Sequence, residues 1–426
     1  MLTNKKMLLS ILPFIIFWNC SQTSIITSSE PTSSTRKNTI VKTGLDVLLE
    51  NHLDKLYGKR IALVTNHSGI DKNGKLNFSR LQTLSLIRLV KIFTPEHGFT
   101  GNIPDGEHVD YDSNLSEFPP VISLYGKTRR PNPEMLSNID IIIYDIQDVG
   151  ARVYTYISTL GLVMEAAGEA NIPVIVLDRP NPIGGYVDGP ILSENYKSFI
   201  GKYQIPIQYG MTVGELAKMV VGEKMIDPLP ELTVISMENY YRNYLYDETY
   251  LPWTNPSPNI PDLETAIIYP GFCLFQATNV SEGRGTHSPF KQIGAPWIDA
   301  NSLTNLLNQQ NLPGVIFKPV RFTPKSIPTM SKYPKFENKN CKGIEISITK
   351  RDIYKSILTG VTTLWAINKL YSDSLIISKD SLGRIWGSDK LYQQLHEGKT
   401  PSEVINSYQT ELEQFLQIQE KYLIYK

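Results

Sequence analysis

DIIIYDIQDVGAR, residues Asp140–Arg152, is the stretch that decides the fold of this chain. It begins with a continuous run of branched apolar residues, which is typical of a strand buried on both faces of a parallel sheet. Polar and small residues follow immediately, from Gln147 onward. Open α/β sheets bind their ligands beyond the carboxyl ends of the strands, so the pattern indicates both a buried strand and the edge where a site belongs.

Four more segments repeat this arrangement of a short apolar run followed by polar residues. Helical patterns return the chain between most of them, which predicts an α/β fold built on a doubly wound parallel sheet. Beyond about His287 the pattern changes and indicates a second, smaller α+β domain. The four further strands are expected at Arg60–Thr65, Leu89–Phe93, Val121–Leu124 and Pro173–Leu177.

The composition argues against some classes of function. The chain has 426 residues, of which 41% are hydrophobic and 20% charged, as in ordinary globular proteins of two or three domains. Its 42 basic and 42 acidic residues balance, so no global field attracts nucleic acid. We therefore expect no nucleic-acid partner, and the pattern does not indicate an oligomeric state.

The N-terminus carries the signs of export. Two lysines precede the apolar run Met7–Trp18, which is too short to span a bilayer and typical of a signal peptide. Cys20 follows and resembles the lipidated cysteine of bacterial lipoproteins, with a plain secretory signal as the alternative. We assign residues 1–19 to the signal and the Ser/Thr-rich residues 20–42 to a disordered tether. The protein is then expected in the cell envelope, with the lipid as its only contact with the membrane.

Glu96 and His97 directly follow the expected strand Leu89–Phe93, once Pro95 has ended it. A carboxylate beside an imidazole can transfer protons, and Phe99 offers an apolar wall that favours a protonated acid. The alternative is a charged pair at a strand end with no chemical role. Because several polar clusters should meet at one sheet edge, a site is the favoured interpretation.

Other strand ends supply further candidates for substrate binding. Asp145 and Asp148 precede Arg152, and an arginine held by two carboxylates suits a substrate carboxylate. No histidines stand at ligand spacing, so we expect no metal. The remaining candidates are Asn66, Tyr154, Asp178 and Arg179, the last two with a buried structural pair as an equal alternative.

Two later segments add amide, acidic and basic groups. The loop Asn239–Pro261 contains Asn259 among many tyrosines and prolines, and the apolar run around Cys273 is expected to be a strand. Carboxylates, amides and arginines, without a nucleophile motif or a glycine-rich nucleotide loop, suit a glycosidase. The glycine-punctuated turn after Cys273 holds Asn279, Glu282, Arg284 and Thr286.

Seven blocks of the sequence resemble the bacterial exo-β-N-acetylmuramidases of the NamZ type, over about residues 44–425. The resemblance implies a Rossmann-like N-terminal domain, here residues 43–286, and a smaller C-terminal domain, here residues 287–426. It also implies release of N-acetylmuramic acid from the non-reducing ends of peptidoglycan fragments. The blocks are PEHGF (95–99), DIQDVGARVYTYISTL (145–160), LDRPNPIGG (177–185), YGMTVGELA (209–217), PSPNIP (256–261), YPGFCLF (269–275) and TNVSEGRGT (278–286).

The resemblance also implies roles for individual residues. It makes Glu96 the catalytic residue. This sequence departs from the family at Gln276-Ala277, where the family commonly has Glu-Gly. The acetamido group of muramic acid could attack the anomeric carbon itself; otherwise Asp148 or Glu282 must act as nucleophile or base. The lactyl carboxylate of muramic acid needs a cationic partner, for which the candidates are Arg152, Arg179 and Arg284.

We therefore predict an exo-acting glycosidase that uses Glu96 as general acid and no cofactor. Its substrates would be peptidoglycan-derived muropeptides or disaccharides that end in N-acetylmuramic acid. The alternative is a non-catalytic glycan-binding lipoprotein that lost the reaction through a change such as Gln276. A nucleotide-using Rossmann enzyme is a weaker third interpretation, because the glycine fingerprint is missing.

Overall fold

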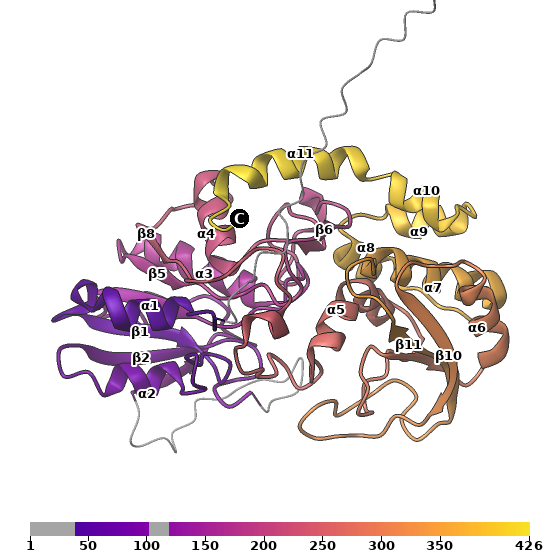
Figure 1. Cartoon of the computed structure of the whole chain (residues 1–426), viewed down its shortest axis with the longest axis horizontal. Coiled ribbons are helices and arrows are strands. Elements are labelled where there is room, and N and C mark those ends of the chain that lie inside the picture. The colour runs from indigo at the N-terminus through magenta and orange to yellow at the C-terminus, as the bar shows by residue number, and fades with distance from the viewer. Residues whose placement is uncertain (1–38, 102–118) are drawn as a thin grey trace, which may run out of the picture. The chain divides into compact units, whose positions relative to one another are not determined.

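Six parallel strands form the main sheet of the computed structural model, which describes residues 39–101 and 119–426. Their order across the sheet is β3, β2, β1, β4, β5, β8, so the winding reverses between β1 and β4. The predicted doubly wound parallel sheet is confirmed (Figure 1). The strands are β1 Arg60–Thr65, β2 Arg88–Thr94, β3 Val121–Ser123, β4 Ile141–Asp145, β5 Val174–Leu177 and β8 Leu232–Ile235.

Helices cover both faces of this sheet. Successive side chains of a strand point to opposite faces, and in β1 Leu63 packs in one apolar cluster and Val64 in the other. Helices α1 and α2 contribute to the first cluster, and α3 and α4 to the second. Their bounds are α1 Gly44–Asn51, α2 Asn77–Gln82, α3 Tyr156–Glu169 and α4 Val213–Gly222.

The C-terminal half is the predicted smaller α+β unit. Its antiparallel sheet has the strand order β10, β11, β9, and α6 and α7 pack against it (Figure 1). The strands are β9 Gln292–Ala295, β10 Val315–Phe322 and β11 Cys341–Ile348, and a small pair in the first half is β6 Val187–Asp188 with β7 Gln208–Tyr209. The helices are α5 Leu263–Phe272, α6 Ala300–Asn308, α7 Ser356–Tyr371, α8 Lys379–Trp386, α9 Lys390–His396, α10 Pro401–Asn406 and α11 Gln409–Gln419.

The apolar run around Cys273 is helical, so the strand predicted there is wrong. Helix α5 reaches Phe272 and continues as a 3₁₀ helix over Cys273–Ala277. Every residue from Thr265 to Phe275 is buried. A helix that is buried on all sides has no polar face, so its sequence lacks the helical period that would distinguish it from a buried strand.

The export features lie outside the described residues. These are the predicted signal peptide, the lipid-anchor candidate Cys20 and the tether up to Asn38. Within residues 39–101 and 119–426, no helix is both long enough and apolar enough to cross a bilayer.

A buried ion pair joins two neighbouring strand ends. Arg179 Nε donates to Asp145 Oδ1 at 2.6 Å, and both side chains are almost fully buried. Asn77 Nδ2 donates to the other Asp145 oxygen at 2.8 Å. The pair considered from the sequence, Asp178 with Arg179, is not formed between side chains; only the backbone N–H of Arg179 reaches Asp178.

Asp178 instead caps a helix and holds the C-terminus. Its oxygens accept from Thr212 Oγ1 at 2.7 Å, from Gly214 N at 2.8 Å and from Tyr425 Oη at 2.6 Å. Thr212 is the N-cap of α4, with the capping box to Glu215 that the sequence predicts. Asp178 therefore has a structural role at the end of β5.

Asp148 is a third buried carboxylate on this edge. Its Oδ2 accepts hydrogen bonds from Tyr209 Oη and from Gly150 N. Burial raises the pKa of the Asp148 carboxyl to about 6, because the charged form loses its hydration and two donors restore only part of it.

The raised pKa of Asp148 predicts a pH-dependent stability. Between about pH 4 and 6 the native protein binds more protons at this carboxyl than the unfolded chain does. The contribution of Asp148 to the free energy of unfolding is therefore full below about pH 4 and is lost as the pH rises through 6. We expect Asp148→Asn to be more stable than the unmutated protein at pH 8, by about 1–3 kcal/mol, and equally stable near pH 4. Urea unfolding followed by circular dichroism measures both.

A matched control has the opposite sign. Asp140 lies at the surface, and its ion pair with Arg60 lowers the pKa of that carboxyl, so Asp140→Asn should lose stability at pH 8 rather than gain it. A stability difference between Asp148→Asn and the unmutated protein that stays constant from pH 4 to 8 would contradict the argument.

Candidate active site

Glu96 stands on a tight turn immediately after β2. His97 and Gly98 both have left-handed backbone conformations, with φ of 70° and 67°, and Gly98 N donates to Pro95 O at 3.2 Å. A histidine in this conformation is uncommon, and burial holds it there: His97 is 2% exposed. The turn leaves Glu96 half-buried, with its carboxylate at the sheet edge.

Thr155 fixes the Glu96 side chain. Its Oγ1 donates to Glu96 Oε2 at 2.7 Å, instead of capping α3, which begins at the next residue. The bond joins the end of β2 to the start of the helix that follows β4. The carboxylate is thereby oriented by a neutral donor.

Glu96 lines a small cavity of about 120 Å³. This is below the roughly 300 Å³ at which sites for whole drug-sized ligands begin, so the cavity suits one part of a saccharide. Of the acidic residues in the described ranges, only Glu96 lines it. The other lining residues are His97, Val153, Tyr154, Thr155, Ile200, Ser257, Asn259, Ile260, Tyr269, Gln276, Arg284 and Phe290.

Aromatic rings form one wall. Tyr154 and Tyr269 meet edge to face with their centroids 6.2 Å apart, and Tyr269 meets Phe290 in the same way at 4.9 Å. Edge-to-face packing fixes the rings in place. A rigid apolar wall of this kind suits the flat, carbon-bearing face of a sugar ring.

A charged cluster orients Arg284, which lines the same cavity from the glycine-punctuated turn after Cys273. Arg284 Nη2 lies 3.4 Å from Gln276 Oε1, and its Nε lies 3.5 Å from Glu282 Oε1. Lys335 Nζ donates to Glu282 Oε2 at 2.9 Å and to the carbonyls of Phe275 and Val280. Arg284 and Lys335 therefore share the buried Glu282 carboxylate, and Arg284 also lines the cavity.

Asn259 brings the tyrosine-rich loop into the wall. Its backbone N–H donates to Ser257 Oγ at 3.1 Å, and its Nδ2 donates to Met330 O at 2.9 Å. Asn66 contacts this loop through Tyr156. Its Nδ2 donates to Tyr156 Oη at 2.8 Å, and that hydroxyl donates to Pro256 O at 2.6 Å.

Arg152 lies elsewhere, and the prediction that two carboxylates hold it is wrong. The side chain is fully buried, and its terminal nitrogens donate to the carbonyls of Pro190, Ile205 and Ile385 at 2.6–2.8 Å. Burial lowers the pKa of its guanidinium to about 9. Arg152 ties the two halves of the chain together, because Ile385 belongs to α8.

Several other candidates also lie outside the cavity wall. Asn279 bonds to Ser374 O and to the backbone of Ile376, and Thr286 Oγ1 closes its own turn on Gly283 O. Glu282 touches the cavity only through Arg284. The structure therefore brings together Glu96, His97, Tyr154, Asn259 and Arg284, and separates from them Asn66, Asp145, Asp148, Arg152, Asp178, Arg179, Asn279, Glu282 and Thr286.

Sequence reasoning missed three residues that shape the site. Thr155 stands just before a helix, where a hydroxyl is usually a cap, so its bond to Glu96 had no local signal. Tyr269 lies in the segment that was expected to be a strand. Lys335 comes from a loop of the C-terminal half, and nothing near it in the sequence indicates its contact with Glu282.

No group of three or more histidine, cysteine, aspartate or glutamate side chains in the described residues is arranged to hold a metal ion.

Comparison with known proteins identifies the family. A model of the N-terminal domain of the exo-β-N-acetylmuramidase NamZ matches residues 61–264, and a model of its C-terminal domain matches residues 267–425. The chain is 42% identical to the peptidoglycan β-N-acetylmuramidase NamZ of Bacillus subtilis (strain 168), over 95% of this chain and 96% of that protein.

Two solved structures are similar to this chain over most of its length. A DUF1343 family protein from Bacteroides fragilis NCTC 9343 is 35% identical with a TM-score of 0.83, and a second from the same strain is 32% identical with a TM-score of 0.73. Each similarity covers 91% of this chain and 99% of the other. The chain therefore belongs to the NamZ family of exo-β-N-acetylmuramidases.

Proposed function

We propose that this protein is an exo-acting glycosidase that releases terminal β-1,4-linked N-acetylmuramic acid from the non-reducing ends of peptidoglycan fragments in cell-wall turnover. The observation that carries the proposal is the Glu96 carboxylate, held by Thr155 in a cavity walled by aromatic rings, amides and an arginine. Membership of the NamZ family supports the substrate class. Muropeptides and disaccharides that end in muramic acid are the expected substrates.

Glu96 is the proposed general acid, which protonates the glycosidic oxygen as the bond to the anomeric carbon breaks. The Thr155 hydroxyl restricts the rotamer of Glu96 through one neutral hydrogen bond. His97 is buried under the turn and edge-on to Tyr156, which suits a residue that positions the turn.

Arg284 is the proposed partner of the lactyl carboxylate. Among the three arginines considered from the sequence, Arg152 and Arg179 are buried with partners of their own, whereas Arg284 lines the cavity. A guanidinium can hold a carboxylate with two parallel hydrogen bonds. Glu282 and Lys335 are then positioning residues that keep this guanidinium in place.

The acetamido group of the substrate is the proposed nucleophile. Asp148 and Glu282 do not line the cavity, so no described carboxylate other than Glu96 faces the substrate. The acetamido oxygen would attack the anomeric carbon while Glu96 gives its proton to the leaving oxygen. Water would then attack the same carbon, break its bond to the acetamido oxygen and give a proton to Glu96, which restores both the acetamido group and the acid. The side-chain amides of Gln276 and Asn259 are the candidates to orient the acetamido group.

The cellular address remains a proposal of the same kind. An enzyme that acts on peptidoglycan is expected to be exported to the cell envelope, and Cys20 is the proposed lipid anchor. The boundary between the two domains is proposed at residues 286 and 287.

A second candidate function is favoured by one observation. Gln276 lines the cavity at a position where the family commonly has glutamate, so a non-catalytic muropeptide-binding lipoprotein is the alternative. Thermal stabilisation by N-acetylmuramic acid without turnover of any muramide would support the binding protein over the enzyme.

The rate of a reaction that Glu96 assists as general acid should depend on the leaving group. We expect Glu96→Gln to lower kcat/KM on the disaccharide of N-acetylmuramic acid and N-acetylglucosamine by about 10²–10⁴-fold. The loss of kcat/KM on the para-nitrophenyl β-muramide should be much smaller, because nitrophenolate leaves without a proton. This constant covers the steps up to departure of the leaving group, so it leaves out the later attack of water, in which Glu96 takes a proton. Steady-state kinetics on both substrates measures it.

Thr155→Val removes the hydroxyl that holds Glu96 and should also lower kcat/KM on the disaccharide, whereas Thr155→Ser keeps the hydroxyl and is its matched control. Equal losses of kcat/KM on both substrates in Glu96→Gln would exclude Glu96 as the acid.

The Arg284 guanidinium should contribute to the selectivity between muramides and glucosaminides. Arg284→Met should lower the ratio of kcat/KM for the aryl muramide to that for the aryl glucosaminide by about tenfold, because only the muramide carries the carboxylate. Arg284→Lys keeps the charge and should lose less of the ratio. An unchanged ratio in Arg284→Met would assign recognition of the lactyl group to another residue.

The acetamido mechanism determines the configuration of the released sugar. Two successive attacks on one carbon retain its configuration, so the first product should be the β-anomer of N-acetylmuramic acid. Proton NMR of the anomeric signals within the first minutes of reaction measures this before mutarotation. Initial release of the α-anomer would contradict the acetamido mechanism and require a second carboxylate that activates water.

A further inference from the structure

A second cleft lies one turn of α3 from the candidate site. Ser158 lines it and stands three residues after Thr155, on the same side of the helix. The two spaces also share a wall segment, because Ile200 lines the cavity of Glu96 and the adjacent Phe199 lines the cleft. The cleft measures about 510 Å³.

The described walls of this cleft are basic and contain no acidic side chain. Two of its four cations have partners: Arg130 pairs with Glu169 at 2.6 Å and Lys202 with Glu165 at 2.8 Å. The other two, Lys127 and Arg129, are exposed, and neither forms an ion pair within residues 39–101 and 119–426. The cleft can therefore accept an anionic group without displacing an existing partner.

Aromatic side chains hold one of these cations in place. The Arg129 guanidinium lies 4.4 Å from the centre of the Phe199 ring, and Tyr125 lies 6.1 Å from the same ring. Tyr125 closely follows β3, which pairs with β2 so that Thr94 stands beside Ser123. A guanidinium stacked on a ring is oriented before a ligand arrives, and its edge remains available to a carboxylate.

We propose that this cleft binds the part of the substrate beyond the scissile bond, and that Arg129, with Lys127, binds a carboxylate of that part. The inference rests on the proposed function. Muramyl and glucosaminyl units alternate in peptidoglycan, so the second sugar after the scissile bond is again a muramyl unit. Its carboxylate comes either from a free lactyl group or from a peptide attached there.

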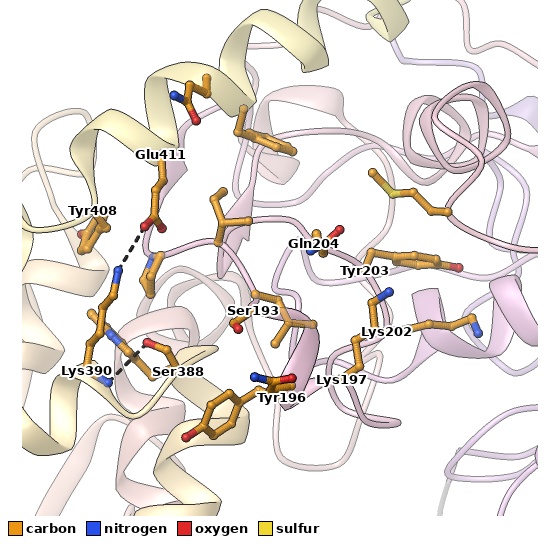
Figure 2. Close-up of a pocket in the computed structure, with 18 of the residues that line it drawn as sticks. Ser193, Tyr196, Lys197, Lys202, Tyr203, Gln204, Ser388, Lys390, Tyr408 and Glu411 are labelled. Carbon is orange, nitrogen blue, oxygen red and sulfur yellow. Dashed lines mark hydrogen bonds and ion pairs between the residues drawn. The ribbon is translucent and has the colours of Figure 1, made fainter.

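A further cavity that could hold more of a glycan chain lies beyond Lys202. This residue also lines a cavity of about 820 Å³ between the segment that follows Pro190 and the helix α11. Figure 2 shows Lys202, Tyr203 and Gln204 on one side of that cavity and the ion pair of Lys390 with Glu411 on the other. The cleft and this larger cavity are therefore adjacent at Lys202.

The test measures binding by isothermal titration calorimetry to the full-length protein carrying Glu96→Gln, so that the sugars stay intact. The ligands are the disaccharide of N-acetylmuramic acid and N-acetylglucosamine, and the trisaccharide with one more N-acetylmuramic acid. The trisaccharide is used with a free lactyl carboxylate and with an L-alanyl-D-glutamate stem. We expect the trisaccharide to bind more tightly, and Arg129→Gln to weaken it about tenfold relative to the disaccharide.

Two further variants sharpen the result. Arg129→Lys keeps the charge but not the planar fork, so an intermediate loss is expected. Arg88→Gln removes an exposed arginine at the opposite end of β2 and should leave both affinities unchanged. The trisaccharide form that loses more affinity in Arg129→Gln identifies the source of the carboxylate.

Equal affinities for the two sugars, or an unchanged affinity ratio in Arg129→Gln with a native circular dichroism spectrum, would overturn the inference. The proposed function is tested separately by turnover of the aryl muramide by the unmutated protein. Failure of turnover would reject the enzyme, whereas the affinity ratio alone decides the cleft.

Discussion

The ion pair of Asp145 and Arg179 is the interaction on which the edge of the sheet depends. Asp145 ends β4 and Arg179 follows β5, and the bond between them is almost fully buried. Asn77 from α2 and the Thr65 hydroxyl from β1 also bind Asp145, through its carboxylate and its carbonyl. Removing one partner would leave an uncompensated buried charge, which costs about 3–5 kcal/mol. The ends of β1, β4 and β5 are therefore joined at Asp145, through its carbonyl and its carboxylate.

The candidate site does not lie at the usual place in such a sheet. Open α/β sheets bind ligands where the winding reverses, which here is between β1 and β4. That position is filled, because Ser68 from the β1 end accepts the Gln147 N–H of the β4 end at 3.1 Å. The cavity lies instead over the end of β2, where Glu96 accepts a hydrogen bond from a neutral hydroxyl and remains half-buried.

The sequence was sufficient for five of the six strands of the sheet but only partly for the site. Runs such as DIIIYDI predict buried strands because their branched residues need cover on both faces. The same reasoning collects polar groups at one edge, yet it cannot tell which of them find buried partners. Arg152 finds Ile385 and Asp178 finds Tyr425, each more than 200 residues away. Such contacts leave no local pattern, so structural and functional residues look alike until the chain is folded.

Gln276 bears on how the candidate site can bind a substrate. A glutamate at this position would place a second carboxylate beside Arg284, which already contacts Glu282. The amide of Gln276 adds no charge there and offers both a donor and an acceptor to the wall. The exchange removes a possible second carboxylate, but a substrate with its own acetamido group does not require one. Gln276 is thus compatible with an enzyme that binds muramic acid through Arg284 and uses the substrate itself as the nucleophile.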